Sequence, residues 1–205
     1  MSTILNVNGR YFFKNYFDNR GKRREFSCRM VAISATSLSL IVPVNGRVGA
    51  PVCAEFQDFG KFEGTVQELL PQGFSMQIEA TDEEREKLTA KIAWCQKYVR
   101  YEVQDLRKHR RVIPREPIAT VILADGSKHR CFVIDVSASG IAISAEVIPE
   151  IGTPLAIGKL VGRVVRHLPS GFAVHFAALQ TLGTVEKAIA YTPPEPALHQ
   201  RVWVD

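Results

Sequence analysis

The chain has 205 residues, a length that predicts two small domains, each with a modest core of its own. Its composition is 46% hydrophobic and 23% charged, which excludes an intrinsically disordered chain. A net charge of +5 favours an anionic partner but lies below the charge density typical of nucleic-acid binders. No apolar run approaches the roughly 20 residues of a membrane helix and the N-terminus lacks a secretory segment, so we expect no membrane insertion and a cytoplasmic location.

A segment near residue 30 begins an internal repeat. Residues 28–37 align without a gap on residues 131–140, which lie 103 positions further on (131 − 28). Gly49-Ala-Pro51 matches residues 152–154 at the same separation, and residues 64–66 and 71–74 then match at a separation of 98 (162 − 64). Copies of this size are domains rather than solenoid units, whose repeats run to about 20–50 residues. We expect domains at residues 1–98 and 99–205.

The first domain is predicted to end in a helix. Residues 81–84 form a capping box, in which Thr81 and Glu84 satisfy each other's free backbone donors. The apolar residues that follow share one helical face, which should cover the rest of the domain. These residues are Leu88, Ile92, Cys95 and Val99. Residues 99–106 are interpreted as the join between the domains, and a helix that continues across the join is the alternative.

The second domain shows closely spaced strands. Asp125-Gly126 is a strong hairpin turn between two apolar, β-branched runs. Glycine, proline and serine separate the further runs at the spacing typical of a small barrel. The expected strands are residues 118–123, 130–136, 140–144, 154–157, 160–166 and 172–176. A short helix is expected at residues 180–191, where Pro193-Pro194 stops it.

Two short motifs in the second domain carry the candidate chemistry. Residues 107–111 contain an R-x-x-x-R pattern, Arg107 and Arg111, and residues 135–140 contain a D-x-S-x-x-G pattern, Asp135, Ser137 and Gly140. Neither pattern is specific alone. Together, inside a small β-rich domain, they resemble the PilZ family of cyclic di-GMP receptors.

The resemblance covers residues 105–190 well and residues 10–98 more weakly, through the repeat. It implies a mainly β fold of two six-stranded antiparallel β-barrels, each followed by a C-terminal α-helix, with a degenerate first copy. It also implies that an arginine segment folds over cyclic di-GMP on the outer face of the second barrel. Cyclic di-GMP is expected as a ligand, and no cofactor is expected.

The residue types fit that ligand. The guanidinium of an arginine is a planar fork that can donate in bidentate fashion to O6 and N7 of guanine, and it also neutralises phosphate. Asp135 can accept hydrogen bonds from guanine N–H groups, Ser137 can donate or accept, and Gly140 allows a close backbone approach or a sharp turn. Arg110 and Arg166 are weaker candidates, for which simple surface charge is the alternative.

Plain structural interpretations remain for both motifs. The basic run at residues 107–115 can be a solvated connector, and residues 135–140 can be an Asx or Ser turn. In the first domain, Ala32, Ser34 and Ser37 stand at the positions of the second motif, and Ile4 and Asn8 stand at those of the arginines. That domain is therefore not expected to bind ligand and is interpreted as a dimerisation, docking or regulatory surface. Residues 20–24 repeat R-x-x-x-R but align with the Asp125-Gly126 turn, so we interpret them as a basic turn.

Catalysis and metal binding have little support. The four cysteines lie in apolar segments without C-x-x-C spacing, and the five histidines show no metal spacing. A triad of Ser137, His167 and Asp135 is disfavoured, because no nucleophile elbow surrounds Ser137 and we expect Asp135 and Ser137 on opposite faces of their strand. We expect reduced cysteines, no metal site and no enzymatic activity.

The sequence thus predicts a cyclic di-GMP receptor that changes interdomain or partner contacts and regulates motility, polysaccharide or related behaviour. One alternative is a non-binding PilZ-like adaptor, and another is a single-stranded nucleic-acid binder, although no exposed aromatic pairs accompany the basic run. A protein partner of unknown identity and a homodimer are both compatible with the sequence.

Overall fold

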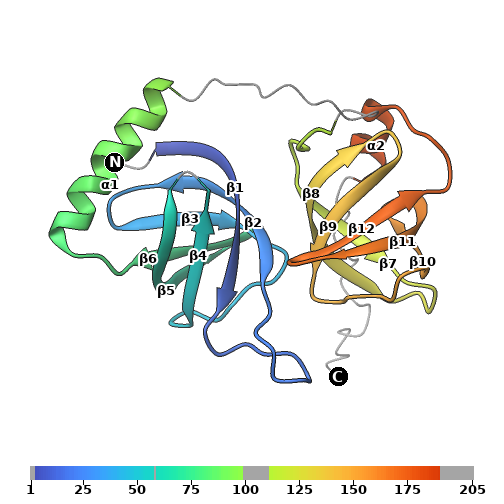
Figure 1. Ribbon diagram of the computed structural model, residues 1–205, viewed down its shortest axis with the longest axis horizontal. Coiled ribbons are helices and arrows are strands. Elements are labelled where there is room, and N and C mark those ends of the chain that lie inside the picture. The colour runs from blue at the N-terminus through green and yellow to red at the C-terminus, as the bar shows by residue number, and fades with distance from the viewer. Residues whose placement is uncertain (1–2, 58, 99–110, 190–205) are drawn as a thin grey trace, which may run out of the picture.

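The computed structural model describes residues 3–57, 59–98 and 111–189, which form two barrels placed side by side (Figure 1). The first barrel has six strands that pair in the order β1-β2-β3-β6-β5-β4 and close on themselves. The bounds are β1 Thr3–Phe13, β2 Phe26–Ile33, β3 Ser37–Ile41, β4 Pro51–Phe56, β5 Gly60–Leu70 and β6 Gly73–Ile78. Helix α1, Asp82–Tyr98, follows the last strand.

The second barrel has the same topology. Its strands pair in the order β7-β8-β9-β12-β11-β10, and each strand is antiparallel to its neighbours. The bounds are β7 Ile118–Ile122, β8 Lys128–Ser137, β9 Gly140–Ala145, β10 Pro154–Ile157, β11 Leu160–Leu168 and β12 Gly171–Phe176. Helix α2, Leu182–Ile189, follows the last strand and begins two residues after the predicted start at residue 180, whereas the predicted end at residues 190–191 lies outside the described residues. The predicted fold, two six-stranded barrels each followed by a helix, is confirmed.

Matching bulges support the internal repeat. The β2–β3 ladder shifts register between Met30 and Ala32, and the β8–β9 ladder shifts between Val133 and Asp135. Each pair of positions is separated by the 103 residues of the alignment. The bulges in β5 and β11, at Val66/Glu68 and Val164/Arg166, likewise lie 98 residues apart. Bulges are designed features of a sheet, so their repetition shows that the two barrels share their irregularities as well as their strand order.

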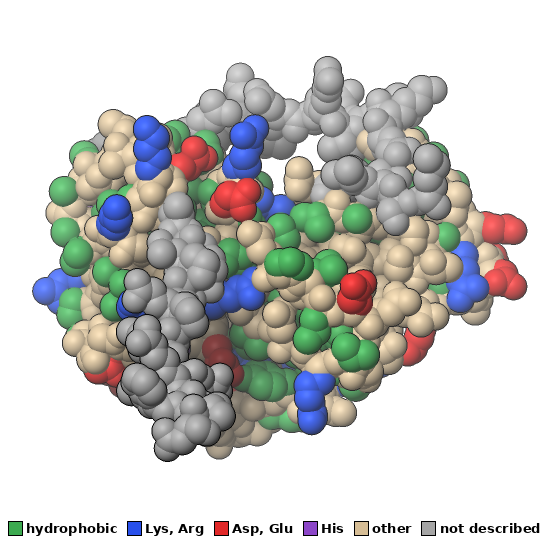
Figure 2. Space-filling model, turned by 180° about the vertical axis from the view of Figure 1, so that it is seen from behind, with side chains coloured by type: hydrophobic (Ala, Val, Ile, Leu, Met, Phe, Trp, Pro, Cys, Tyr) green, Lys and Arg blue, Asp and Glu red, His purple; other side chains and the backbone are tan. Residues whose placement is uncertain are grey.

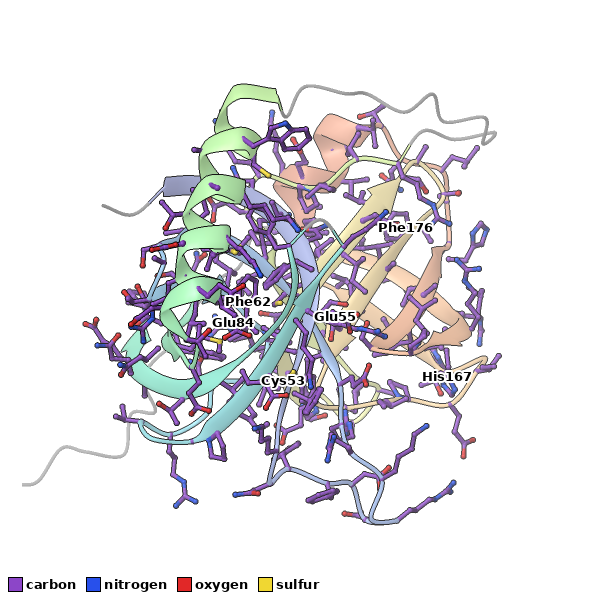
Figure 3. All side chains as sticks on the ribbon, turned by 60° about the vertical axis from the view of Figure 1, so that its left-hand side comes forward. Cys53, Glu55, Phe62, Glu84, His167 and Phe176 are labelled. Carbon is purple, nitrogen blue, oxygen red and sulfur yellow. The ribbon has the colours of Figure 1, made fainter. Side chains whose placement is uncertain are left out.

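Each barrel has its own apolar core, and α1 covers the first core. Leu88, Ile92 and Cys95 are buried against it, as the helical periodicity predicts, whereas Val99 lies outside the described residues. The capping box is present, since Glu84 accepts from the Thr81 amide at 2.8 Å and the Glu84 amide donates to Thr81 Oγ1 at 3.3 Å. Figure 3 labels Glu84 beside Phe62 of β5, where α1 begins. All four cysteines are buried and none forms a disulfide, and burial raises the pKa of Cys131 to about 12.

The barrels meet through polar contacts on the outer face of β2. Ser27 and Arg29 are buried there, because β8 and β9 cover this face of the first barrel. The Ser27 amide donates to Ser144 Oγ at 3.0 Å, and Arg24 Nη2 donates to the Glu146 carbonyl at 2.6 Å. Arg24 belongs to the predicted basic turn, which is confirmed as part of the loop between β1 and β2. The boundary between residues 98 and 99 falls in a part of the chain that is not described and stays a prediction.

Candidate functional site

A cleft on the outer surface of the second barrel brings together most of the predicted binding residues. It lies across the neighbouring strands β8, β9, β12 and β11, and its volume is about 210 Å³. Arg111, Asp135, Ser137, Gly140 and Arg166 all line it. The described part of the arginine segment and the second motif therefore share one surface, although 24 residues separate Arg111 from Asp135 (135 − 111).

An ion pair joins the two motifs. Arg111 Nη1 donates to Asp135 Oδ2 at 3.1 Å, and the two side chains keep 32% and 26% of their surface exposed. The backbone beside this pair is also tied to the barrel. Val112 and Val136 exchange two amide–carbonyl hydrogen bonds, of 2.8 and 2.9 Å. Arg111 is thus fixed at the rim of the cleft while its guanidinium remains accessible from solvent.

The bulges determine which side chains face the cleft. In β8, Val133 and Val136 point into the core, so the extra residue in the bulge leaves both Ile134 and Asp135 on the outer side. In β11, the bulge likewise places Val165 and Arg166 together at the cleft. A bulge breaks the strict alternation of a strand and re-aims side chains, which is why Asp135 and Arg166 converge from separate strands.

Ser137 and Gly140 shape the turn between β8 and β9. Ser137 Oγ donates to the Gly140 carbonyl at 3.2 Å, so the plain structural interpretation of this motif holds for the serine. A Cβ at Gly140 would lie 2.4 Å from the Val174 carbonyl oxygen, and the glycine is therefore required by the close approach of β12. Its φ is not positive, so a strained turn is not the reason for the glycine.

The expectation that Asp135 and Ser137 point to opposite faces is wrong, because side chains two residues apart share a face of a strand and both line the cleft. His167 does not line this cleft. Its Nε2 lies 2.8 Å from the Pro149 carbonyl oxygen, and Figure 3 shows it at the end of β11. A catalytic triad of Ser137, His167 and Asp135 is therefore not assembled, because His167 lies outside the cleft. Within residues 3–57, 59–98 and 111–189, no cluster of three metal-ligating side chains occurs.

Sequence reasoning missed His175 and the apolar floor of the cleft. His175 lies opposite Gly140 in the β9–β12 register and lines the cleft beside the second motif. The apolar side chains of the floor come from Ala142, Val165 and Ala173, whereas Ile141 and Val174 also line the cleft but have their side chains in the core of the barrel. The alternation of β12 marks His175 as outward-facing, but only the pairing of β12 with β9 places it beside Gly140. Arg107 and Arg110 lie outside the described residues.

The equivalent surface of the first barrel carries different chemistry. Ala32 replaces Asp135, and Glu68 stands at the bulge position of Arg166. Ser34 keeps the turn of Ser137, because its Oγ donates to the Ser37 carbonyl at 3.2 Å. The first barrel therefore retains the turn and loses the charges that an anionic ligand requires.

Comparisons with known proteins identify the second domain. Residues 105–191 match the family model for the PilZ domain. The C-terminal domain is a PilZ domain. Its match begins two residues before Arg107, so the PilZ domain contains both sequence motifs.

Three of the solved structures that resemble this chain align with about nine tenths of its length. The PlzA protein of Borreliella burgdorferi in complex with c-di-GMP is 13% identical, with 92% of this chain and 91% of that chain covered and a TM-score of 0.30. The Bacillus subtilis inhibitor of motility, MotI/DgrA, is 13% identical, with 89% and 92% covered and a TM-score of 0.29. The K. pneumonia MrkH–c-di-GMP complex is 12% identical, with 89% and 83% covered and a TM-score of 0.29. At such TM-scores these likenesses carry no argument about function. No curated protein matches the chain.

Proposed function

We propose that this chain is a cytoplasmic receptor for cyclic di-GMP, which binds at the cleft of the PilZ domain. One observation carries the proposal: Arg111, Asp135 and Arg166 converge on a single cleft of a domain whose family match includes both motifs. No helix among the described residues is long and apolar enough to cross a membrane.

The chemistry of the cleft suits a guanine nucleotide. Two guanidinium groups, Arg111 and Arg166, offer planar donors for phosphate oxygens and for O6 and N7 of guanine. The carboxylate of Asp135 accepts from the guanine N–H groups while it still pairs with Arg111, because its two oxygens accept several hydrogen bonds. The aliphatic floor contacts the faces of a base.

The size of the cleft indicates that it holds part of the ligand. Its volume of about 210 Å³ is below the roughly 300–1,000 Å³ of sites for drug-sized molecules. A cyclic dinucleotide therefore needs a second contributing surface. In our proposal, that surface is supplied by the segment that precedes Arg111 in the chain and carries Arg107 and Arg110.

Ligand binding orders this arginine segment against the PilZ domain and changes how the two domains, or the chain and a protein partner, contact each other. The output is regulation of motility, polysaccharide production or related behaviour. Ligand shifts such an equilibrium only by the difference between its affinities for the two states. Residues 114 and 115, which follow Arg111 in the chain, accept hydrogen bonds from Arg29 of the first domain, so a change at the arginine segment can reach the contacts between the domains.

A calorimetric titration tests the proposal directly. The intact chain is titrated with cyclic di-GMP, with cyclic di-AMP and GTP as matched controls for the base and for the cyclic dinucleotide. We expect micromolar or tighter binding of cyclic di-GMP, which corresponds to about 8 kcal/mol or more, and much weaker binding of the controls. If cyclic di-GMP gives no heat of binding, the alternative function is that of an adaptor that works through protein contacts. Binding of unrelated oligonucleotides with a steep salt dependence would favour a nucleic-acid binder instead.

A further inference from the structure

The outer face of β2 carries an arginine that is buried between the two barrels. Arg29 is 4% exposed, and its guanidinium lies 5.9 Å from the centre of the Phe132 ring in β8. Its Nε donates to Asn8 Oδ1 of β1 at 3.3 Å. Loss of hydration lowers the pKa of Arg29 from its ordinary value. A buried cation at this interface demands a reason beyond packing, because burial of a charge is costly.

The remaining contacts of Arg29 are with the chain that follows Arg111. Its Nη1 donates to the Pro114 carbonyl at 2.9 Å and is 3.3 Å from the Arg115 carbonyl. These acceptors come three and four residues after Arg111. The second barrel fixes the same segment at Val112, through the pair of hydrogen bonds to Val136. The short stretch from Arg111 to Arg115 is therefore held from both sides, by one barrel at Val112 and by the other at Pro114.

We propose that Arg29 of the first domain is a positioning residue for the ligand site of the second domain. It holds the residues 111–115 so that the Arg111 guanidinium stays at the rim of the cleft, and the first domain thereby completes the site. This inference rests on the proposed function for its ligand, cyclic di-GMP. It gives the first domain, which lacks the binding charges, a defined part in binding.

The energetics favour a positional role for this arginine. Among the described residues, Nη2 of Arg29 is buried and has no hydrogen-bond partner, so the side chain is not ideally satisfied. Burial of the Arg29 cation is costly, and its hydrogen bonds to Asn8 and to the two backbone carbonyls offset part of that cost. Replacement by an apolar residue of similar size removes all three bonds, of which the two to the carbonyls hold the segment at Pro114 and Arg115. A segment that is ordered before ligand arrives loses less conformational entropy on binding, and its release weakens the affinity.

The test compares three variants of the intact chain. Arg29→Met keeps the length and the contact with Phe132 but cannot donate, and Arg29→Lys keeps a charge and a donor. Ser27→Ala is the matched control, because Ser27 lies two residues away on the same face of β2 and bonds to Ser144 and Ser170. Amide hydrogen exchange of the peptide that spans residues 111–116 is measured without ligand, and calorimetry gives the affinity for cyclic di-GMP.

We expect Arg29→Met to accelerate exchange at residues 111–116 and to weaken binding about five- to tenfold. Arg29→Lys should recover part of both losses, and Ser27→Ala should change neither. In an Arg111→Ala background, Arg29→Met should have a much smaller effect on affinity, because the residue that it positions is absent. An undiminished effect in that background overturns the proposal.

The two readouts separate this proposal from the proposed function. Unchanged exchange in Arg29→Met overturns the positioning role whatever the affinity. Faster exchange with an unchanged affinity shows that binding does not use the fixed segment, which also overturns it. If the unmodified chain binds no cyclic di-GMP, the proposed function fails and the role in ligand binding fails with it, whereas exchange still decides whether Arg29 holds the segment.

Discussion

Asp135 and Arg111 show that the candidate site depends on how residues from different elements are placed, and not on any one residue. The carboxylate and the guanidinium are common surface groups, and an ion pair as exposed as theirs contributes little to stability. Their value comes from position, since each reaches the cleft from a different element. The sequence predicted these residues through the resemblance of its two motifs to the PilZ family, and the structure brings Arg111 and Asp135 to one cleft. It could not predict His175, because its place beside Gly140 depends on a strand pairing that spacing does not reveal.

Removing either motif arginine should weaken ligand binding. Arg107→Ala and Arg111→Ala each delete charge-assisted hydrogen bonds to the nucleotide. We expect each to lower the affinity for cyclic di-GMP at least about tenfold, or roughly 1.4 kcal/mol, by calorimetry. Arg115→Ala is the control, because Arg115 belongs to the same basic run but does not line the cleft. Near-unchanged affinity in both motif variants would remove the arginines from the site.

Arg166 can be tested against a neighbour on its own strand. Arg166 and Arg163 both lie on β11, but Arg163 Nη1 donates to the Gly152 carbonyl at 3.1 Å and is absent from the cleft lining. We expect Arg166→Ala to weaken binding about fivefold, because one cationic donor is lost, and Arg163→Ala to leave it unchanged. Equal losses in the two variants would indicate a general effect of surface charge. Raising the salt concentration would then abolish the difference from the unmodified chain.

At the scale of elements, local patterns predicted the six strands of the second barrel and both helices, whereas the strands of the first barrel were expected only through the repeat and the family resemblance. Glycine and proline punctuation located the strands of the second barrel to within two or three residues, and the capping box located α1. The bulges were not predicted, because one extra residue in a strand does not change its composition. The buried outer face of β2 was also not predictable. Ser27 and Arg29 have the polarity of solvent-facing residues. The alternation of a strand shows which side chains face outward, but it does not show whether they contact water or a neighbouring domain.

The contribution of the capping box at the start of α1 can be tested by mutation. Thr81→Ala removes the hydroxyl that accepts from the Glu84 amide, so we expect a loss of about 1 kcal/mol in the stability of the first domain. Thr89→Ala is the control. Thr89 lies inside the helix and its hydroxyl donates to the Arg85 carbonyl, so alanine there should be neutral or favourable. Chemical denaturation followed by circular dichroism measures both, and equal effects would contradict the role of the cap.

The β4–β5 hairpin provides a prediction about pH. Glu63 accepts from Lys14 at 2.6 Å and from Lys61, and these bonds lower its pKa from 4.5 to about 2. A lowered folded-state pKa stabilises the fold at pH values above 4.5, and that contribution disappears as the pH falls toward 2. Carboxyl NMR of Glu63 should show the low titration midpoint, and Lys14→Met should raise it. A midpoint near 4.5 in the unmodified chain would contradict the bonds.

At the scale of the whole molecule, the two copies of the repeat share their shape but differ in the charged residues of the surface that carries the cleft. The two barrels share strand order and bulge positions, and Arg29 lies against Phe132, its own counterpart in the repeat. Figure 2 shows acidic and basic side chains scattered over the displayed face, without a continuous block of either sign. On this face the charge is spread, and the cleft remains the proposed site for an anionic ligand. Two-domain organisation could be predicted from the repeat, but the contacts between the domains could not.

Ligand should change the arrangement of the two domains. In the proposed mechanism, ligand orders the arginine segment. This ordering changes the hydrogen bond from Arg29 to the Pro114 carbonyl, which lies at the interface of β2 with β8 and β9. We expect small-angle scattering of the intact chain to show a different distance distribution at saturating cyclic di-GMP, and no change with cyclic di-AMP. Identical curves with and without cyclic di-GMP, at concentrations that calorimetry shows to be saturating, would leave a receptor that binds without rearranging.

Closure of both barrels restricts how a protein partner can bind this chain. Every strand in the described residues is paired on both sides, with the shortest pairing at the seam between β7 and β10. A partner therefore finds no long free edge on which to add a strand of its own. A partner therefore has to contact side chains on the outer surfaces, on the connecting loops or on the two helices. These are also the places where sequence can change without disturbing the hydrogen-bonded cylinders, so new partner surfaces can evolve on an unchanged fold.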